Sequence, residues 1–229
     1  MKLAVIPARG GSKRIPRKNI KIFCGQPMIA WSIQAALNSA CFDRIVVSTD
    51  DAEIAEVARE LGAEVPFIRP HVLADDHTGT LPVIRHAIQA CAMQGFHATQ
   101  VCCIYATAPF ITTKDILQGL EISERSGITY AFTATTYAFP IQRALKLHPA
   151  GGVEMFNPEH FNTRSQDLEE VIHDAGQFYW GKVDSWMQEL PFFTVNSCPV
   201  LLPRHRVQDI DTVEDWQRAE WLFKAMRSQ

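Results

Sequence analysis

The sequence contains no apolar run long enough to cross a membrane and no pair of cysteines at Cys-x-x-Cys spacing. A membrane span needs roughly 20 consecutive apolar residues, and the opening apolar stretch from Leu3 to Ala8 is also too short for a signal-peptide core. The cysteines mostly sit inside apolar segments, without the histidine partners of a zinc site, at Cys24, Cys41, Cys91, Cys102, Cys103 and Cys198. We therefore expect a cytoplasmic protein with free thiols and no membrane partner.

Two common nucleotide-binding signatures are missing as well. The G-x-x-x-x-G-K-[ST] loop is absent, which disfavours a P-loop enzyme, and the absence of G-x-G-x-x-G disfavours a nicotinamide-dependent dehydrogenase. An excess of positive charge is also lacking, since 22 Lys and Arg residues face 25 Asp and Glu residues, for a formal net charge of −3. A domain that binds nucleic acid through a broad basic surface is therefore disfavoured.

What the sequence does have is the composition of an ordinary globular domain, with 47% hydrophobic and 21% charged residues in a chain of 229. Strand-like segments are expected at residues 3–7, 44–48, 64–68, 100–105 and 128–136. Helical segments are expected between them, at residues 27–40, 51–61, 81–93 and 113–125. Apolar strands that alternate with amphipathic helices predict an α/β fold, with a mostly parallel sheet covered by helices on both faces.

The regular pattern weakens between residues 139 and 170, a stretch that is rich in proline and glycine. We interpret it as an arm inserted into a single domain of residues 1–229, built as a hairpin that reaches away from the sheet. The pattern resumes with strand-like segments at residues 176–181, 193–196 and 199–202, and a closing helix is expected at residues 212–226.

The most informative segment follows the first strand. Between Arg9 and Lys21 the chain has no acidic residue and carries six basic ones: Arg9, Lys13, Arg14, Arg17, Lys18 and Lys21. Gly10 and Gly11 allow a tight turn that brings backbone N–H groups against a ligand, and ligands of open α/β sheets bind at the carboxyl ends of strands. These features favour a phosphate-binding loop. A solvated basic loop or a weak nucleic-acid patch is the alternative.

Two pairs of aspartates follow or precede regular elements. Asp209 and Asp211 alternate in an extended segment, so both carboxylates point to one side, as a Mg²⁺ ion would require. The alternative is that Asp211 opens a capping box for the last helix, which would leave Asp209 unexplained. For Asp50 and Asp51, the spacing to Glu53 favours helix capping.

The segment IPARGGSKRIPRKNI (6–20) resembles the I-x-A-R-x-x-S-x-x-x-P-x-K-N signature of the sugar cytidylyltransferases, which make CMP-activated nonulosonic acids. The resemblance extends along the chain, through VSTDD (47–51), RP-x-x-LA-x-D (69–76), Ala108-Pro109 and DID (209–211). Segments 139–145, 162–167 and 173–181 are similar to the branch whose sugar is pseudaminic acid. The sequence departs from the sialic acid branch at Tyr105–Pro109 and at Asp174–Tyr179.

The resemblance implies a Rossmann-like nucleotidyltransferase fold and transfer of CMP from CTP to the anomeric hydroxyl of an acidic nine-carbon sugar, with release of pyrophosphate. Pseudaminic acid is the expected sugar, and N-acetylneuraminate and legionaminate are the alternatives. Mg²⁺ is the expected cofactor. The stretch at 139–170 is similar to the arm that members of the family exchange between protomers, so a homodimer is expected and nucleic acid is not.

The resemblance also implies roles for individual residues. Catalysis is assigned to Arg9, Lys18 and Asp211: the two cations would neutralise charge on the phosphates, and Asp211 would act together with Asp209 as a ligand of Mg²⁺. The expected contacts to CTP are Ala8, Arg9, Gly10, Ser12, Lys13, Lys18, Asn19, Arg69 and Thr80. The expected contacts to the sugar acid are Gln142, Arg143, Arg164, Gln166, Gln177 and Tyr179. Simple solvent exposure is the alternative for Lys13, Arg14, Arg17 and Lys21.

Overall fold

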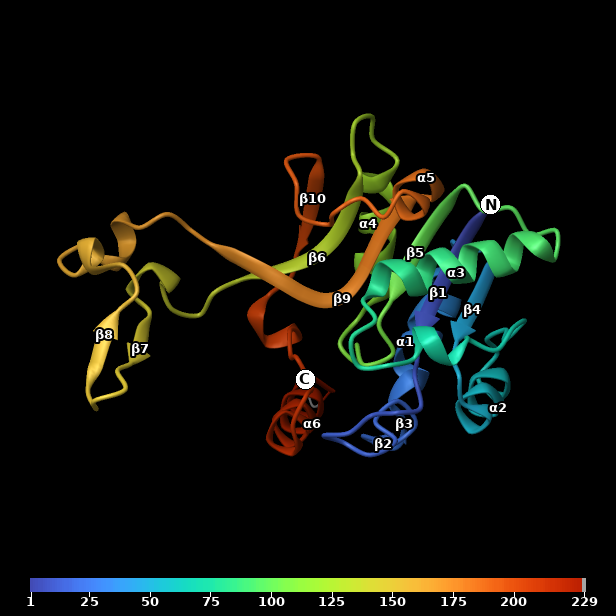
Figure 1. Ribbon diagram of the computed structural model, residues 1–229, viewed down its shortest axis with the longest axis horizontal. Helices are drawn as coiled ribbons and strands as arrows, with labels where there is room; N and C mark the ends of the chain where they lie inside the picture. The colour runs from blue at the N-terminus through green and yellow to red at the C-terminus, as the bar shows by residue number, and fades with distance from the viewer. Residues whose placement is uncertain (228–229) are drawn as a thin grey trace.

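A six-stranded sheet in the order β10-β6-β9-β5-β1-β4 forms the centre of the computed structural model, which describes residues 1–227 (Figure 1). The last two residues of the expected domain, 228–229, lie outside the described part. The strands of this sheet are β1 (Lys2–Pro7), β4 (Arg44–Ser48), β5 (Gln100–Ile104), β6 (Tyr130–Thr136), β9 (Ile172–Lys182) and β10 (Ser197–Leu201). β1 is parallel to β4 and to β5, and β10 is parallel to β6, whereas β9 runs antiparallel to both of its neighbours. The predicted mostly parallel sheet is confirmed.

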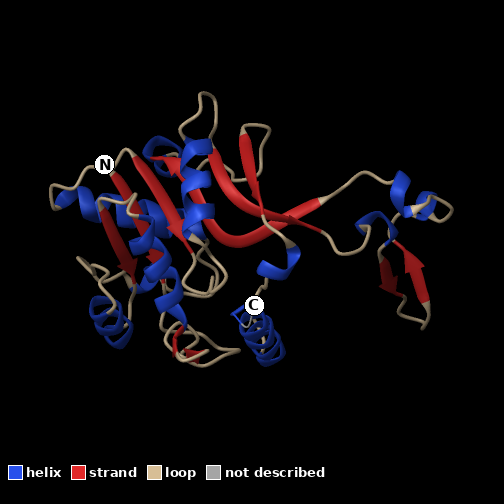
Figure 2. Cartoon of the chain, turned by 180° about the vertical axis from the view of Figure 1, so that it is seen from behind, coloured by secondary structure: helices blue, strands red, loops and turns tan. Residues whose placement is uncertain are grey.

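Helices cover both faces of this sheet, because side chains on its strands alternate between two apolar layers. From β1, Ala4 and Ile6 enter one layer and Leu3 and Val5 enter the other. The first layer is closed by α1 (Met28–Ser39), α2 (Ala52–Glu60) and α4 (Thr113–Ser123), and the second by α3 (Thr80–Met93) and α5 (Val183–Met187). Figures 1 and 2 show these two sets from opposite sides, with α3 in front of the sheet in the first view.

Two expected strands are absent from the structure. The segment 64–68 makes only one bridge, between Val46 and Glu64, because Pro66 has no N–H to continue the ladder. Residues 193–196 form bends and a turn, closed by a hydrogen bond from Ser197 N to Thr194 O (3.0 Å). Both predictions were wrong, since β-rich composition without a partner strand does not make a strand.

β9 is longer than the predicted segment 176–181. It begins at Ile172 and bends at Gly176, whose φ of +60° lies in the left-handed region. The pairing with β6 shifts register between Phe132 and Ala134, opposite this bend. A glycine inside a strand often marks such an irregularity, and here one curved strand leads from the arm into the middle of the sheet (Figure 1).

The stretch between β6 and β9 extends away from the sheet as a separate arm (Figure 1). Its two short strands, β7 (Leu145–Leu147) and β8 (Val153–Met155), pair as an antiparallel hairpin. Large apolar side chains are exposed along it, with Leu147 at 85%, Phe139 at 83% and Phe161 at 70%. Residues 139–170 therefore bury little apolar surface of their own.

A third apolar cluster joins the loop at residues 9–21, which we call the basic loop, to the last helix. The short strand β2 (Ile22–Phe23) pairs with β3 (Gln26–Pro27). Phe23 packs with Ile15 of the loop and with Trp216 and Phe223 of α6 (Val213–Arg227). Ile210, which is 2% exposed, belongs to the same cluster. Its burial turns the flanking Asp209 and Asp211 toward the basic loop.

All six cysteines are free, three of them buried and three half-buried. Within residues 1–227, every helix falls short of the length or the apolar character that a membrane crossing requires.

Candidate active site

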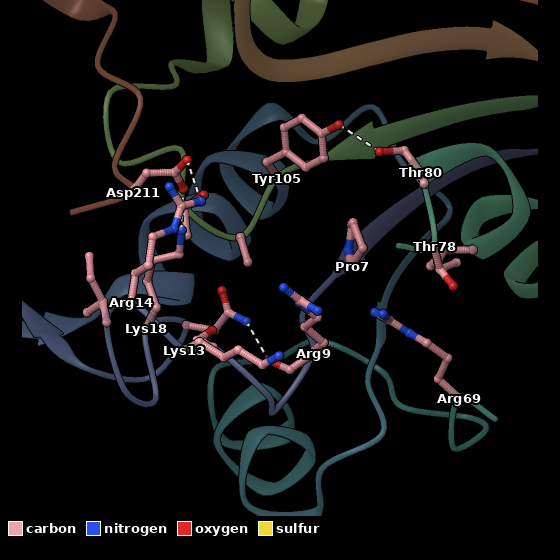
Figure 3. Close-up of a pocket in the computed structure, with 17 residues that line it drawn as sticks. Pro7, Arg9, Lys13, Arg14, Lys18, Arg69, Thr78, Thr80, Tyr105 and Asp211 are labelled. Atoms are coloured by element: carbon pink, nitrogen blue, oxygen red, sulfur yellow. Dashed lines mark hydrogen bonds and ion pairs between the residues drawn. The ribbon is translucent and has the colours of Figure 1, made fainter. Parts of the chain in front are cut away.

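A cavity of about 270 Å³ lies at the carboxyl ends of β1 and β5 (Figure 3). Pro7 at the end of β1 and Tyr105 directly after β5 form part of its wall. The basic loop, the first residues of α3 and Asp211 complete it. Of the predicted residues, the cavity gathers Arg9, Ser12, Lys13, Lys18, Asn19, Arg69, Thr80 and Asp211. We refer to this cavity as the first pocket.

The cations of the first pocket face two carboxylates. Arg9 Nη1 lies 2.7 Å from Asp76 Oδ1, and Lys13 pairs with the other oxygen of the same carboxylate. Arg14 Nη2 lies 2.7 Å from Asp211 Oδ2, and Lys18 Nζ lies 3.2 Å from Asp211 Oδ1. Hydrogen bonds from Lys13 and Arg9 hold the pKa of Asp76 below its usual value. The basic loop and the distant acidic segment therefore meet in one place, with positive charge in excess.

The path of the loop is fixed from within. Asn19 Nδ2 donates to Arg9 O (3.0 Å), and Lys18 Nζ donates to Ile210 O (2.7 Å). A Cβ atom on Gly10 would stand 2.7 Å from Asp51 Oδ2, so only glycine fits, and Gly10 N donates to Asp50 Oδ1 (3.0 Å). These bonds close the loop around the pocket before any ligand is bound.

Two of the predicted CTP contacts do not line the pocket. Ala8 is 1% exposed, and its N–H donates to Ser48 O (2.9 Å). The N–H of Gly10 is already used by Asp50. Both residues shape the turn instead of presenting a donor to the cavity.

The capping alternatives for the aspartates are resolved by the hydrogen bonds. Asp51 caps α2, accepting from Ile54 N (3.0 Å), and it also pairs with Arg17. The capping interpretation of Asp211 was wrong. At the start of α6, Thr212 Oγ1 accepts from Asp215 N (3.1 Å) and Thr212 N donates to Asp215 Oδ2 (2.8 Å), so Asp211 remains available to the pocket.

A larger cavity of about 730 Å³, which we call the second pocket, adjoins the first. The two share Lys18, Tyr105, Thr107 and Asp211. The second pocket adds Asp209, Asp174 and Arg218 of α6. One ligand in each pocket would therefore have Lys18 and Asp211 at the boundary between them.

The two carboxylates of the acidic segment suit a divalent cation. Partial desolvation by the surrounding chain raises the pKa of Asp209, although the residue is exposed, and the negative charge of Asp211 raises it further. A cation between them would relieve this repulsion. Within the described residues, no three Asp, Glu, His or Cys side chains gather in a way that could hold a metal. The two aspartates therefore fit Mg²⁺, which binds through one or two carboxylates together with substrate phosphates and water.

Buried and half-buried polar side chains support the wall of the first pocket. Arg69 is 4% exposed and donates through Nε to Ser48 Oγ (3.1 Å). Burial lowers its pKa to about 10, so it is still cationic at neutral pH. Thr80 Oγ1 and Tyr105 OH lie 2.7 Å apart, as the dashed line in Figure 3 marks. This arrangement places a fixed positive charge and two hydroxyl groups beside the cavity.

Two predicted sugar contacts lie behind the second pocket. Tyr179 is 2% exposed, and its hydroxyl donates to Asp174, which does line the pocket. Burial raises the pKa of Tyr179 far above its usual value, so this hydroxyl stays protonated and acts as a donor. Gln177 is 3% exposed and donates through Nε2 to Arg206 O (2.7 Å). Neither side chain lines the first or the second pocket.

The other four predicted sugar contacts are on the arm and line neither pocket of their own chain. Gln142 donates to Glu169 O (2.9 Å), and Arg164 pairs with Asp167 (2.6 Å). Arg143 and Gln166 lie in the 3₁₀ turns of the same arm. Figure 1 shows the arm well separated from the carboxyl ends of β1 and β5.

The sequence interpretation missed several pocket residues. Tyr105 and Thr107 follow a buried strand at its carboxyl end, which is a position that could have identified them. Asp76 belongs to a segment that was quoted for its resemblance but given no role. Arg218 is an exposed residue of an amphipathic helix, and the sequence carries no signal for it.

Comparison with known proteins agrees with this geometry. A family model described as "Cytidylyltransferase" matches residues 3–179, and the chain belongs to this family of nucleotidyltransferases. The chain is 47% identical over 223 residues to the pseudaminic acid cytidylyltransferase of Campylobacter jejuni, a match that covers 97% of this chain and 96% of the relative. The predicted nucleotidyltransferase class and the predicted relationship are both confirmed.

A second relative and a solved structure are similar to the chain at lower sequence identity. The chain is 32% identical over 229 residues to the CMP-N,N'-diacetyllegionaminic acid synthase of Legionella pneumophila, covering 97% of this chain and 96% of the relative. Among solved structures, CMP:2-keto-3-deoxy-manno-octonic acid synthetase complexed with CTP has a TM-score of 0.71. Its identity is 16%, with 98% of this chain and 99% of that chain covered, so it supports the fold alone.

Proposed function

We propose that this protein transfers CMP from CTP to the anomeric hydroxyl of pseudaminic acid, giving CMP-pseudaminic acid and pyrophosphate. The observation that carries this proposal is the meeting of the basic loop and the Asp209–Asp211 segment in one cavity of a cytidylyltransferase. The reaction belongs in the cytoplasm, where CTP is available, and no contact with nucleic acid or membrane is part of it.

The first pocket suits the nucleotide. Arg9, Lys13 and Lys18 offer positive charge to a triphosphate, which would replace the carboxylate of Asp76 as the partner of Arg9 and Lys13. Lys18 is held against Ile210 O, so its ammonium group is oriented before the substrate arrives. Such preorganised charge stabilises the negative charge that develops as pyrophosphate leaves.

The second pocket suits the sugar acid, because it joins the first at Lys18 and Asp211. A sugar bound there presents its anomeric hydroxyl toward the α-phosphate, and direct attack requires no covalent enzyme intermediate. Holding the two substrates in this relation converts a bimolecular reaction into a unimolecular one. Arg218 offers a guanidinium group to the carboxylate of the sugar.

Mg²⁺ is the cofactor of this proposal, and Asp209 and Asp211 are the residues that would hold it. When bound, the ion neutralises phosphate charge and makes the α-phosphorus more electrophilic. The contribution of the chain is to keep the two carboxylates on one side of an extended segment, beside Lys18.

A homodimer completes the proposal. The exposed apolar side chains of the arm need a partner surface, and the arm carries four candidate sugar contacts that line neither the first nor the second pocket of its own chain. A second copy that receives the arm would bury its exposed apolar side chains. The candidate sugar contacts, Arg143 and Arg164 among them, would then reach the second pocket of that copy. The arm would therefore act on the partner.

Identity to named relatives favours pseudaminic acid as the sugar. The value is 47% for the Campylobacter jejuni relative and 32% for the Legionella pneumophila relative, over nearly the whole chain in both cases. The decisive experiment incubates the purified protein with CTP, Mg²⁺ and, separately, pseudaminic acid, N,N'-diacetyllegionaminic acid and N-acetylneuraminate. Released pyrophosphate and the CMP-sugar are measured, with Lys18→Ala as the inactive control. Faster turnover of either alternative sugar would overturn the assignment of the substrate, and no turnover of any would overturn the activity.

A further inference from the structure

A buried ion pair lies outside both pockets, between Asp115 of α4 and Arg206. Arg206 Nη2 is 2.5 Å from Asp115 Oδ2, and the side chains are 16% and 8% exposed respectively. Thr112 Oγ1, the N-cap of α4, donates to the same carboxylate oxygen (2.6 Å). The aspartate is thus fixed in place by the helix before it meets the arginine.

Arg206 lies in the segment that joins β10 to α6, the segment that carries the acidic doublet (Figure 1). Asp209 follows it by three residues and Asp211 by five. The backbone of Arg206 is held as well, because its carbonyl accepts a hydrogen bond from Gln177 Nε2 (2.7 Å). Three separate elements, α4, β9 and the joining segment, therefore meet at this one residue.

The segment is also tied at its two ends. Leu202 N donates to Ala134 O (2.8 Å), and Thr135 Oγ1 donates to Leu202 O (2.8 Å), which fixes the start against β6. Lys18 Nζ donates to Ile210 O (2.7 Å), which fixes the end against the basic loop. Between these ties, Arg206 makes polar contacts to α4 and β9, and Val207 beside it packs against the first apolar layer.

We propose that Asp115 and Arg206 form a latch that positions the Asp209–Asp211 doublet for the metal and the phosphates. Both are positioning residues and not catalytic ones, because neither lines a pocket. Gln177 takes part in the latch through its amide group, which gives it a role other than sugar contact. The expected effects on Mg²⁺ dependence and KM rest on the proposed function. The expected effect on amide exchange rests on the structure alone.

A role in positioning agrees with the energetics of such pairs. A buried ion pair contributes little net stability, because removing two charges from water costs about as much as their attraction returns. Arg206 Nε is moreover buried without a partner among the described residues, a further cost. The pair therefore adds little to the stability of the fold, but it fixes the position of the segment that joins β10 to α6.

The test compares Arg206→Gln and Asp115→Asn with Arg206→Lys, which keeps the charge. Arg125→Gln is the matched control, since it removes an exposed pair with Glu121 on the same helix. Three quantities are measured: the Mg²⁺ concentration that gives half the maximal rate, the KM for CTP, and the hydrogen exchange of amides 207–211 without metal or nucleotide.

For Arg206→Gln and Asp115→Asn we expect the half-activating Mg²⁺ concentration to rise about tenfold, as for other supporting residues of metal sites. The KM for CTP stays within about twofold, and amides 207–211 exchange faster. Arg206→Lys recovers part of both effects, and Arg125→Gln shows neither.

A lower melting temperature with unchanged exchange and unchanged Mg²⁺ dependence would overturn the latch. If one variant fails to fold, the other two still decide. If the wild-type protein releases no pyrophosphate with any sugar acid, the proposed function fails, while the exchange measurement still decides whether the latch holds the segment.

Discussion

The basic loop and the arm are both irregular segments that follow a strand of the same sheet, yet they behave in opposite ways. The loop at residues 9–21 folds back onto its own chain, with Ile15 buried and with side-chain bonds to Arg9 O and Ile210 O. The arm at residues 139–170 extends outward and leaves Leu147 and Phe161 exposed. Its ion pairs, such as Lys146 with Glu154, stay within the arm.

The two segments differ in whether a single chain supplies all the contacts that the segment needs. The loop already has its charges, its turn and its supporting bonds, so it needs only a ligand. The arm exposes apolar side chains and carries arginines that line neither the first nor the second pocket of its own chain, which is why we propose that a second copy receives it. Changes in the loop should therefore affect chemistry, and changes in the arm should affect assembly first.

The largest effect is expected in the loop. Lys18→Ala and Arg9→Ala should each lower kcat by about 10²–10³, the usual loss when a preorganised group at the developing charge is removed. Circular dichroism and the melting temperature should stay close to the wild-type values, as they should for the exposed control Arg59→Ala. A wild-type rate in Lys18→Ala would remove the loop from the mechanism.

Assembly is the matching test for the arm. The double substitution Leu147→Glu and Phe161→Glu places charge on its exposed apolar side chains, so sedimentation should give a monomer where the wild type gives a dimer. Because both positions are exposed in a single chain, the free energy of unfolding of the monomer should change by less than about 0.5 kcal/mol per site. Met93→Glu, which alters an 82% exposed residue outside the arm, is the control. A wild-type protein that sediments as a monomer contradicts the proposed dimer.

Mixing two inactive variants sharpens the comparison further. A Lys18→Ala protomer has an intact arm, and an Arg143→Ala protomer has an intact loop. If the arm serves the partner, half of the mixed population is heterodimer with one complete site. The rate should then return to about a quarter of the wild-type value. No recovery on mixing, with exchange of protomers verified, would show that arm and loop act within one chain.

Asp209→Asn tests the acidic doublet, of which Asp209 lines the second pocket and Asp211 lines both. Loss of one carboxylate should raise the half-activating Mg²⁺ concentration by about tenfold while the KM for the sugar changes little, since Asp209 would act through the metal. Glu214→Gln, an exposed acidic neighbour on α6, is the control. An unchanged Mg²⁺ titration would assign the metal to other ligands.

The smallest expected effect concerns the support of the loop by Arg17 and Asp51. The Arg17 guanidinium lowers the pKa of Asp51 to about 2, with one N–O distance of 3.0 Å. The stabilisation is therefore present above the unfolded-state pKa near 4 and is lost as the pH falls toward 2. Asp51→Asn should be less stable than the wild type by about 1 kcal/mol at pH 7, allowing for partial solvent screening. Denaturant titrations should show this gap closing below pH 4, and a constant gap would contradict the pairing.

Much of the sheet could be predicted from the sequence, because its strands are apolar runs bounded by helices. The limits of β4 were predicted at Arg44–Ser48, as the structure has them. The segment 64–68 looked equally strand-like, but whether it pairs depends on a neighbour and on the missing N–H of Pro66. Composition reports the preference of a segment, whereas pairing is decided by the rest of the chain.

The site divides in the same way. The charges of the loop and the doublet could be found, because a dense local cluster and a period of two are visible in one dimension. Gln177 and Tyr179 were assigned to the sugar, yet β9 turns both side chains into the interior. Arg218 could not be found, since the helix that brings it to the second pocket is placed only by the packing of Trp216 and Phe223.

The position of β9 has a consequence for how the protein is made. This strand forms the bridge between β5 and β6, and it is synthesised only after the whole arm. Until residue 182 has left the ribosome, β4, β1 and β5 can pair with one another, but β6 has no partner strand, and such open edges are prone to aggregation. Chains cut short inside the arm should therefore be far more dependent on chaperones than chains that end just after β9.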